Sequence, residues 1–76
     1  MNFIKKNDIL SKCQIIEQND EHYYLDNMEG SFYDIILVKG KKNKNKFRIG
    51  DVIKVKVLKI CVANDGTPGL FVEYIE

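Results

Sequence analysis

Apolar residues recur at every second position over most of this chain, which is the period of a β-strand with one buried face. The pattern is clearest over residues 51–60 (DVIKVKVLKI), where Ile53, Val55 and Val57 share one face and lysines occupy the other. Strands of this kind must pair and cover their apolar face. We therefore expect an all-β protein.

Four further segments show strand character, and turn-forming residues separate them. The other predicted strands are residues 9–17, 22–26, 32–38 and 70–75. Turns rich in Asn, Asp and Gly are expected at residues 18–21, 27–31 and 64–69. Residues 9–17 also fit helical spacing from a cap at Asn7 or Asp8, and we favour the strand.

The chain has 76 residues, which is enough for one small domain covering residues 1–76. Residues 1–8 are expected to form a flexible N-terminal extension. Five short strands, with the longest connection between the third and the fourth, favour a closed barrel because closure removes exposed sheet edges. The five-stranded OB-fold has this layout, and an SH3-like barrel is the alternative.

Positive charge is concentrated in one segment. Nine of the twelve Lys and Arg residues lie between Lys39 and Lys59, where Asp51 is the single acid, so this segment has a formal charge of +8 and the remainder −7. Its densest part, residues 39–51 (KGKKNKNKFRIGD), is predicted to be a loop that leads into a strand. A cationic loop of this kind is typical of proteins that bind a phosphate backbone.

The same segment resembles a known family. The matching residues are Gly40, Lys41, Lys44, Asn45, Phe47, Arg48, Ile49, Gly50 and Asp51. This pattern, followed by an alternating strand, is similar to bacterial translation initiation factor one and the related S1-like OB-folds that bind RNA. The resemblance runs from about Ile9 to Tyr74, and it implies an OB-fold, RNA binding and a role in translation on the small ribosomal subunit.

Candidate site residues follow from charge and from the aromatic strands. If Leu25 and Ile35 point inward, Tyr23 and Tyr33 do too, while Tyr24 and Phe32 face solvent. A cationic groove with exposed rings is typical of single-strand binding, because every base can stack on an aromatic ring. The candidate nucleic-acid-binding residues are Lys39, Lys41, Lys42, Lys44, Lys46, Arg48, Lys54, Lys56, Tyr24 and Phe32.

Several classes of function lack support in the sequence. His22 is the single histidine and has no catalytic motif around it, and Cys13 and Cys61 do not have metal-ligand spacing. We therefore expect no enzyme activity, no cofactor and no metal. Both cysteines lie among aliphatic residues and are expected to act as small buried hydrophobes. The absence of a long apolar run predicts a cytoplasmic protein without a membrane partner. We expect the protein to be monomeric by itself.

The sequence thus predicts an OB-fold that binds RNA or single-stranded DNA through its basic loop and the adjoining barrel face. An alternative remains open. The lysine-rich loop could instead dock on an acidic protein, as in an adaptor or an inhibitor, since any anionic surface would relieve repulsion among its cations.

Overall fold

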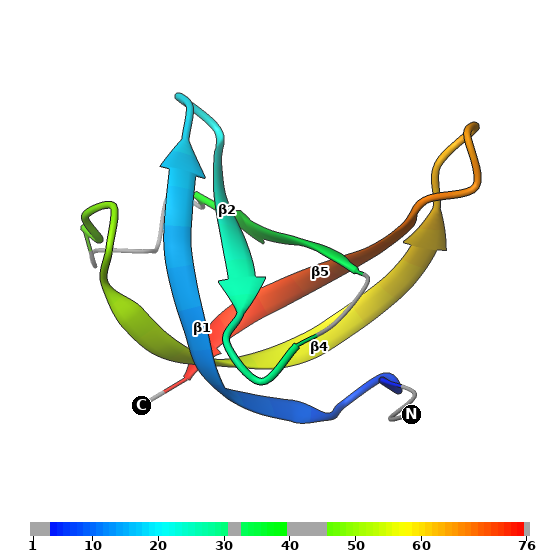
Figure 1. The fold of residues 1–76 in the computed structure, drawn as a ribbon, viewed down its shortest axis with the longest axis horizontal. Coiled ribbons are helices and arrows are strands. Elements are labelled where there is room, and N and C mark those ends of the chain that lie inside the picture. Colours follow the sequence, from blue (N-terminus) through cyan, green and yellow to red (C-terminus); the bar gives the residue numbers. More distant parts are fainter. Residues whose placement is uncertain (1–3, 31–32, 40–45, 76) are drawn as a thin grey trace.

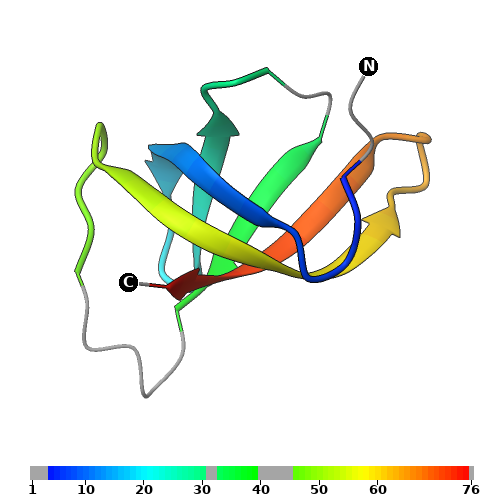
Figure 2. The ribbon, with the colours of Figure 1, turned by 90° about the horizontal axis from the view of Figure 1, so that it is seen from below.

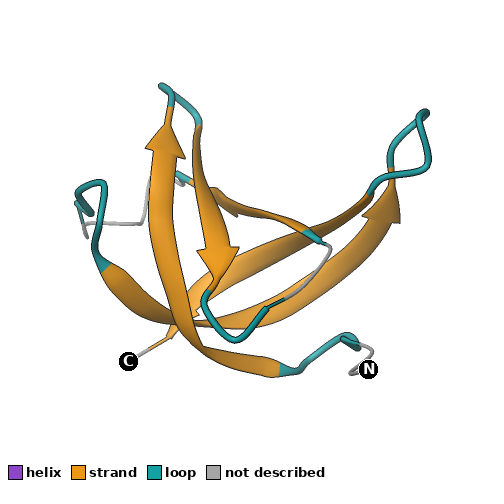
Figure 3. Ribbon diagram, in the orientation of Figure 1, coloured by secondary structure: helices purple, strands orange, loops and turns teal. Residues whose placement is uncertain are grey.

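The chain folds into five β-strands joined by turns and loops (Figures 1 and 3). The computed structural model describes residues 4–30, 33–39 and 46–75. The strands are β1 (Ile9–Gln18), β2 (His22–Asn27), β3 (Asp34–Val38), β4 (Val52–Val62) and β5 (Pro68–Ile75). Within these described ranges there is no helix. The predicted all-β class is confirmed.

The strands close into a barrel in the order β1-β2-β3-β5-β4. Strand β3 pairs with β5 in parallel, and the other four pairings are antiparallel. The lysine-rich residues 39–51 lie between β3 and β4, as predicted. This is a small OB-fold-like barrel, and it confirms the architecture that the sequence predicts.

The core consists of apolar side chains from alternate positions of all five strands. Its members are Cys13, Ile15, Tyr23, Leu25, Ile35, Leu37, Ile53, Val55, Val57, Leu70 and Val72. Full burial of an aliphatic side chain stabilises a fold by about 1.5–3 kcal/mol, so this set supplies most of the driving force for closure. The inward orientation predicted for Tyr23 is confirmed, and the partly buried Tyr33 packs against the core.

Strand β1 departs from simple alternation. Its pairing with β4 shifts register between Leu10 and Cys13, and its pairing with β2 shifts between Ile15 and Glu17. Because of the first shift, Leu10 packs against the core while Ile9 is 51 % exposed. Strict alternation, which places Ile9 on the face of Cys13 and Ile15, is therefore wrong for this end of the strand.

The described part of the predicted N-terminal extension, residues 4–8, is bound to the barrel (Figure 2). The Asn7 N–H donates to the Val57 carbonyl (2.8 Å), and the Val57 N–H donates to the Asp8 carbonyl (2.9 Å). Ile4 packs against the core. The N-terminal segment therefore extends the backbone contacts along β4 to Val57, one residue beyond the last β1–β4 pair at Lys56.

The other strand boundaries differ slightly from the prediction. Strand β3 begins at Asp34 rather than at residue 32, whereas β4 continues to Val62 and β5 begins at Pro68. The longer β4 and β5 form a hairpin whose tip projects past the other strands at the right of Figure 1. We call the part of this hairpin formed by residues 58–62 and 68–71 the β4–β5 ribbon.

Candidate nucleic-acid interface

Four outward-facing residues from four strands lie side by side on the outside of the barrel. Tyr24 of β2 is opposite Ile36 of β3, Ile36 is beside Phe71 of β5, and Phe71 is opposite Lys59 of β4. Each of the three apolar members lies between two buried residues of its strand, so alternation directs it outward. We call Tyr24, Ile36, Phe71 and Lys59 the outer row.

The outer row offers apolar and aromatic surface with a cation at one end. Tyr24, Ile36 and Phe71 are partly exposed, and Lys59 is exposed. The ring of His22 lies 6.2 Å from that of Tyr24, centroid to centroid, with a tilt of 45°. The Tyr24 hydroxyl accepts a hydrogen bond from the Asn19 side chain (3.1 Å). The tyrosine ring is thus held in place from the β1–β2 turn.

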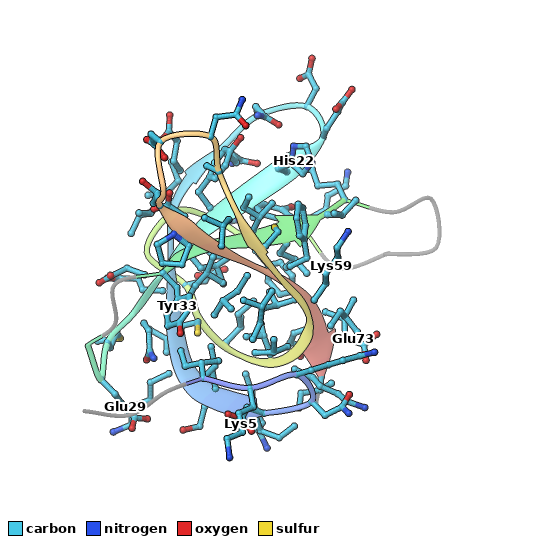
Figure 4. The ribbon with its side chains drawn as sticks, turned by 90° about the vertical axis from the view of Figure 1, so that its right-hand side faces the viewer. Lys5, His22, Glu29, Tyr33, Lys59 and Glu73 are labelled. Carbon is cyan, nitrogen blue, oxygen red and sulfur yellow. The ribbon has the colours of Figure 1, made fainter. Side chains whose placement is uncertain are left out.

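Charge is unequal on the two sides of this row. On one side Lys56 of β4 lies opposite Glu73 of β5, and Lys39 follows the end of β3. Figure 4 shows Lys59 and Glu73 along the same flank of the barrel as His22. On the other side Asp34 lies beside Gly69. A polyanion would therefore favour the side with the lysines.

The two ends of the lysine-rich segment meet at one side chain, Tyr23. The Lys39 ammonium lies 4.4 Å above the centroid of the Tyr23 ring and donates to the Gln18 side chain (2.8 Å). The Phe47 ring packs edge-on to the same tyrosine, with centroids 5.5 Å apart, and the Phe47 N–H donates to the Tyr23 hydroxyl (3.2 Å). Phe47 also contacts Tyr74 (5.0 Å). Aromatic packing therefore closes this end of the barrel.

Arg48 begins a tight turn that leads into β4. Its N–H donates to the Asp51 carboxylate (2.9 Å), and the Asp51 N–H donates back to the Arg48 carbonyl (3.0 Å). Gly50 has φ of +100°, a conformation that glycine adopts without strain, and its N–H donates to the Ile15 carbonyl (2.7 Å). The Arg48 side chain is exposed at the end of the barrel closed by Phe47.

The structure places six of the predicted site residues and divides them into two groups. Tyr24, Lys54 and Lys56 lie on outward faces of β2 and β4. Lys39, Lys46 and Arg48 flank the Phe47 end. Of these, Lys39 already contacts a ring and an amide, so its ammonium is less available than the sequence suggests. The remaining predicted residues, Lys41, Lys42, Lys44 and Phe32, lie outside the described residues.

Sequence reasoning missed Ile36, Phe71 and Lys59. The alternation of residues 70–75 could have identified Phe71, since Leu70 and Val72 are inward. Lys59 could not be found in this way. Strict alternation places it on the inward face of Val57, and the register shift between Val57 and Lys59 turns it outward.

The chemistry of the remaining polar groups is limited. No cluster of three His, Cys, Asp or Glu side chains within residues 4–30, 33–39 and 46–75 could hold a metal ion. Both cysteines are free thiols, Cys13 buried and Cys61 partly exposed. Burial, reinforced by the charges of Asp26 and Glu29, raises the pKa of the Cys13 thiol to about 11. This thiol is therefore protonated at neutral pH and is no nucleophile.

Comparison with known proteins does not identify a family for this chain. No protein-family model matches the chain, and no curated protein matches it significantly. In the described part of the chain, no helix is long and apolar enough to cross a membrane. The barrel and its outer row are therefore the basis for a functional hypothesis.

Proposed function

We propose that this protein binds single-stranded nucleic acid, RNA or single-stranded DNA, across the outer row. The observation that carries the proposal is the alignment of Tyr24, Ile36 and Phe71 on adjacent strands with Lys59 at the end of the row. Aromatic side chains bordered by cations are the usual elements of single-strand recognition. Bases would stack on Tyr24 and Phe71, and phosphates would follow the lysines.

The charge distribution indicates how the backbone of the ligand would lie on this surface. Lys56 and Lys59 lie on β4, and Lys46 and Arg48 precede that strand. Asp34 lies on the other side of the row. The backbone of the ligand would therefore run across the strands beside the outer row, on the side of Lys56, with its bases turned toward Tyr24 and Phe71. Contacts to phosphates and ring faces predict weak sequence preference and clear salt dependence.

The test is fluorescence anisotropy of labelled oligo-U and oligo-dT across a salt series. Phe71→Ala should weaken binding about tenfold without changing the salt slope, because stacking contributes about 1–3 kcal/mol per base. Lys59→Gln should reduce the log–log salt slope by about 0.7, the value for one lost phosphate contact on a single strand. Lys12→Gln, an exposed lysine on β1, is the matched control and should change neither.

Two results would refute the proposal. One is the absence of binding to either oligonucleotide even at low salt. The other is binding that Phe71→Ala and Lys59→Gln leave equal to that of Lys12→Gln, which would place any site away from the outer row.

A second candidate function is docking on an acidic protein. Exposed Ile16, Ile49 and Val52 lie where the Arg48–Asp51 turn contacts β1, and such apolar surface is not needed for phosphate binding. Polynucleotide competition, together with a triple change of Lys41, Lys42 and Lys44 to Glu, distinguishes the two functions. It should abolish RNA affinity if those lysines bind nucleic acid. A docking protein should instead be indifferent to polynucleotide competitor.

A role on the small ribosomal subunit rests on the family resemblance of residues 40–51. Co-sedimentation with purified small subunits tests it. Binding that survives in Lys59→Gln and Phe71→Ala would indicate that the ribosome contacts a different surface from the outer row.

A further inference from the structure

One edge of the β4–β5 ribbon has no strand beside it. Strand β1 pairs with β4 as far as Lys56, and Asn7 and Asp8 bond to Val57. From Leu58 to Val62, no described residue pairs with this edge of β4. Figure 1 shows the hairpin projecting away from β1 and β2, while β3 runs beside β5.

The hydrogen-bonding groups on that edge can be identified from the register. The Ala63 N–H donates to the Thr67 carbonyl (2.9 Å), so the backbone of Ala63 points toward β5. In an antiparallel pair the direction alternates, so Cys61 also points toward β5, and Ile60 and Val62 point away from it. Pro68, opposite Val62, has no N–H and fits such a non-hydrogen-bonded position.

The same two residues expose apolar side chains. Ile60 is 39 % exposed and Val62 is 68 % exposed. Strand β5 of the ribbon pairs with β3 as far as Gly69, so the open edge is that of β4. An apolar edge with unpaired N–H and C=O groups is a template for another strand. The ribbon therefore combines backbone groups and side chains that an added strand would bury.

We propose that this edge pairs with the same edge of a second copy of the chain, in an antiparallel dimer centred on Cys61. In this register Ile60 lies opposite Val62 of the second copy, and Val62 lies opposite Ile60. All the outward-pointing N–H and C=O groups of both residues are then paired across one two-fold axis. A register centred on Ile60 would instead place Val62 opposite Leu58, within the register shift of β4.

Self-pairing also suits the side chains of this strand. The pairs formed by Ile60 and Val62 are apolar in both halves. Lys59 would lie opposite Ala63 of the second copy, two residues from Asp65, so no lysine faces another lysine. The interface is small and the dimer should be weak, in contrast to the monomer that the sequence predicts. The proposal does not depend on nucleic-acid binding.

Sedimentation equilibrium over roughly 10 μM to 1 mM protein tests the dimer, a range suited to a weak interface. The mass should rise with concentration from 8.8 kDa toward twice that value. Val62→Lys should stay monomeric, because a charged edge opposes strand addition. Val38→Lys is the matched control, since Val38 is 49 % exposed on β3, and it should dimerise like the wild type.

Oxidation with diamide tests the register. Residues of a non-hydrogen-bonded pair have Cα atoms about 4.5 Å apart, within the range for a disulfide. Two Cys61 thiols would be oxidised to one disulfide while diamide is reduced to its hydrazide. The wild type should form a covalent dimer at least tenfold faster than Val62→Lys, and Cys61→Ser should form none.

The proposal is overturned by a mass of 8.8 kDa at every concentration, which would leave this edge unpaired or reserved for another protein. Dimerisation that persists in Val62→Lys would also overturn it, because a different surface would then be responsible. Equal rates of cross-linking in the wild type and Val62→Lys would show that the disulfide reflects random collision.

Discussion

At the scale of single residues, the buried thiol of Cys13 makes the stability of the fold depend on pH. Its side chain is fully buried, and burial followed by the charges of Asp26 and Glu29 raises the pKa of its thiol from an ordinary value of 9.0 to about 11. The folded protein therefore accommodates the neutral thiol better than the thiolate. In the unfolded chain the same group ionises freely above pH 9.

This shift predicts a loss of stability at alkaline pH. The contribution of Cys13 is fully present below pH 9 and is lost as pH rises from 9 to 11, because the unfolded chain releases the proton first. The free energy of unfolding should fall by up to about 2 kcal/mol through this group, at about 1.4 kcal/mol per pH unit. Urea unfolding from pH 8 to 11 measures it. Cys13→Ala removes the group and should show a shallower decline, so parallel profiles would contradict the prediction.

Tyr23 holds the ends of the lysine-rich segment through its hydroxyl as well as its ring. Tyr23→Phe keeps the packing with Phe47 but removes the acceptor for the Phe47 N–H, and should cost about 1 kcal/mol of unfolding free energy. Tyr24→Phe is the control. Its hydroxyl bonds to Asn19 in an exposed setting, so it should cost less. Equal losses in urea titrations would argue against a special role for Tyr23.

At the scale of elements, irregular pairing decides which side chains reach the surface. The register shifts in β1 and β4 turn Leu10 inward and Lys59 outward. The entry to β4 depends on the Arg48–Asp51 turn, where Gly50 has φ of +100° and bonds to Ile15. This turn joins the start of β4 to the middle of β1.

Replacing Gly50 tests how much this turn matters. Gly50→Ala should destabilise the barrel by about 1–2 kcal/mol, because a side chain strains positive φ even though no atom lies close to the new Cβ. Gly69→Ala is a matched control in β5, where φ is ordinary and the new Cβ would lie 3.7 Å from the Asp34 carbonyl oxygen. It should have a smaller effect on the urea midpoint. The reverse order would show that crowding outweighs backbone strain.

At the scale of the whole molecule, local pattern predicted the strands, while pairing between strands brought the outer row together. The period-two pattern located all five strands and the inward position of Tyr23, because burial of one strand face places apolar residues at every second position of the sequence. The outer row needs the register of β2, β3, β5 and β4 together. Lys59 shows the limit, since its outward position depends on a bulge relative to β5 that β4 alone does not encode.

Lys39 and Phe47 both contact Tyr23. The connection between these two residues can therefore change without altering the barrel. Because both ends are fixed at one ring, a connection of different length would start and finish at the same place. Doubling a loop costs only about 0.6 kcal/mol in closure entropy. Evolution, or a protein engineer, could therefore replace residues 40–45 with a segment of different length while the five strands stay the same.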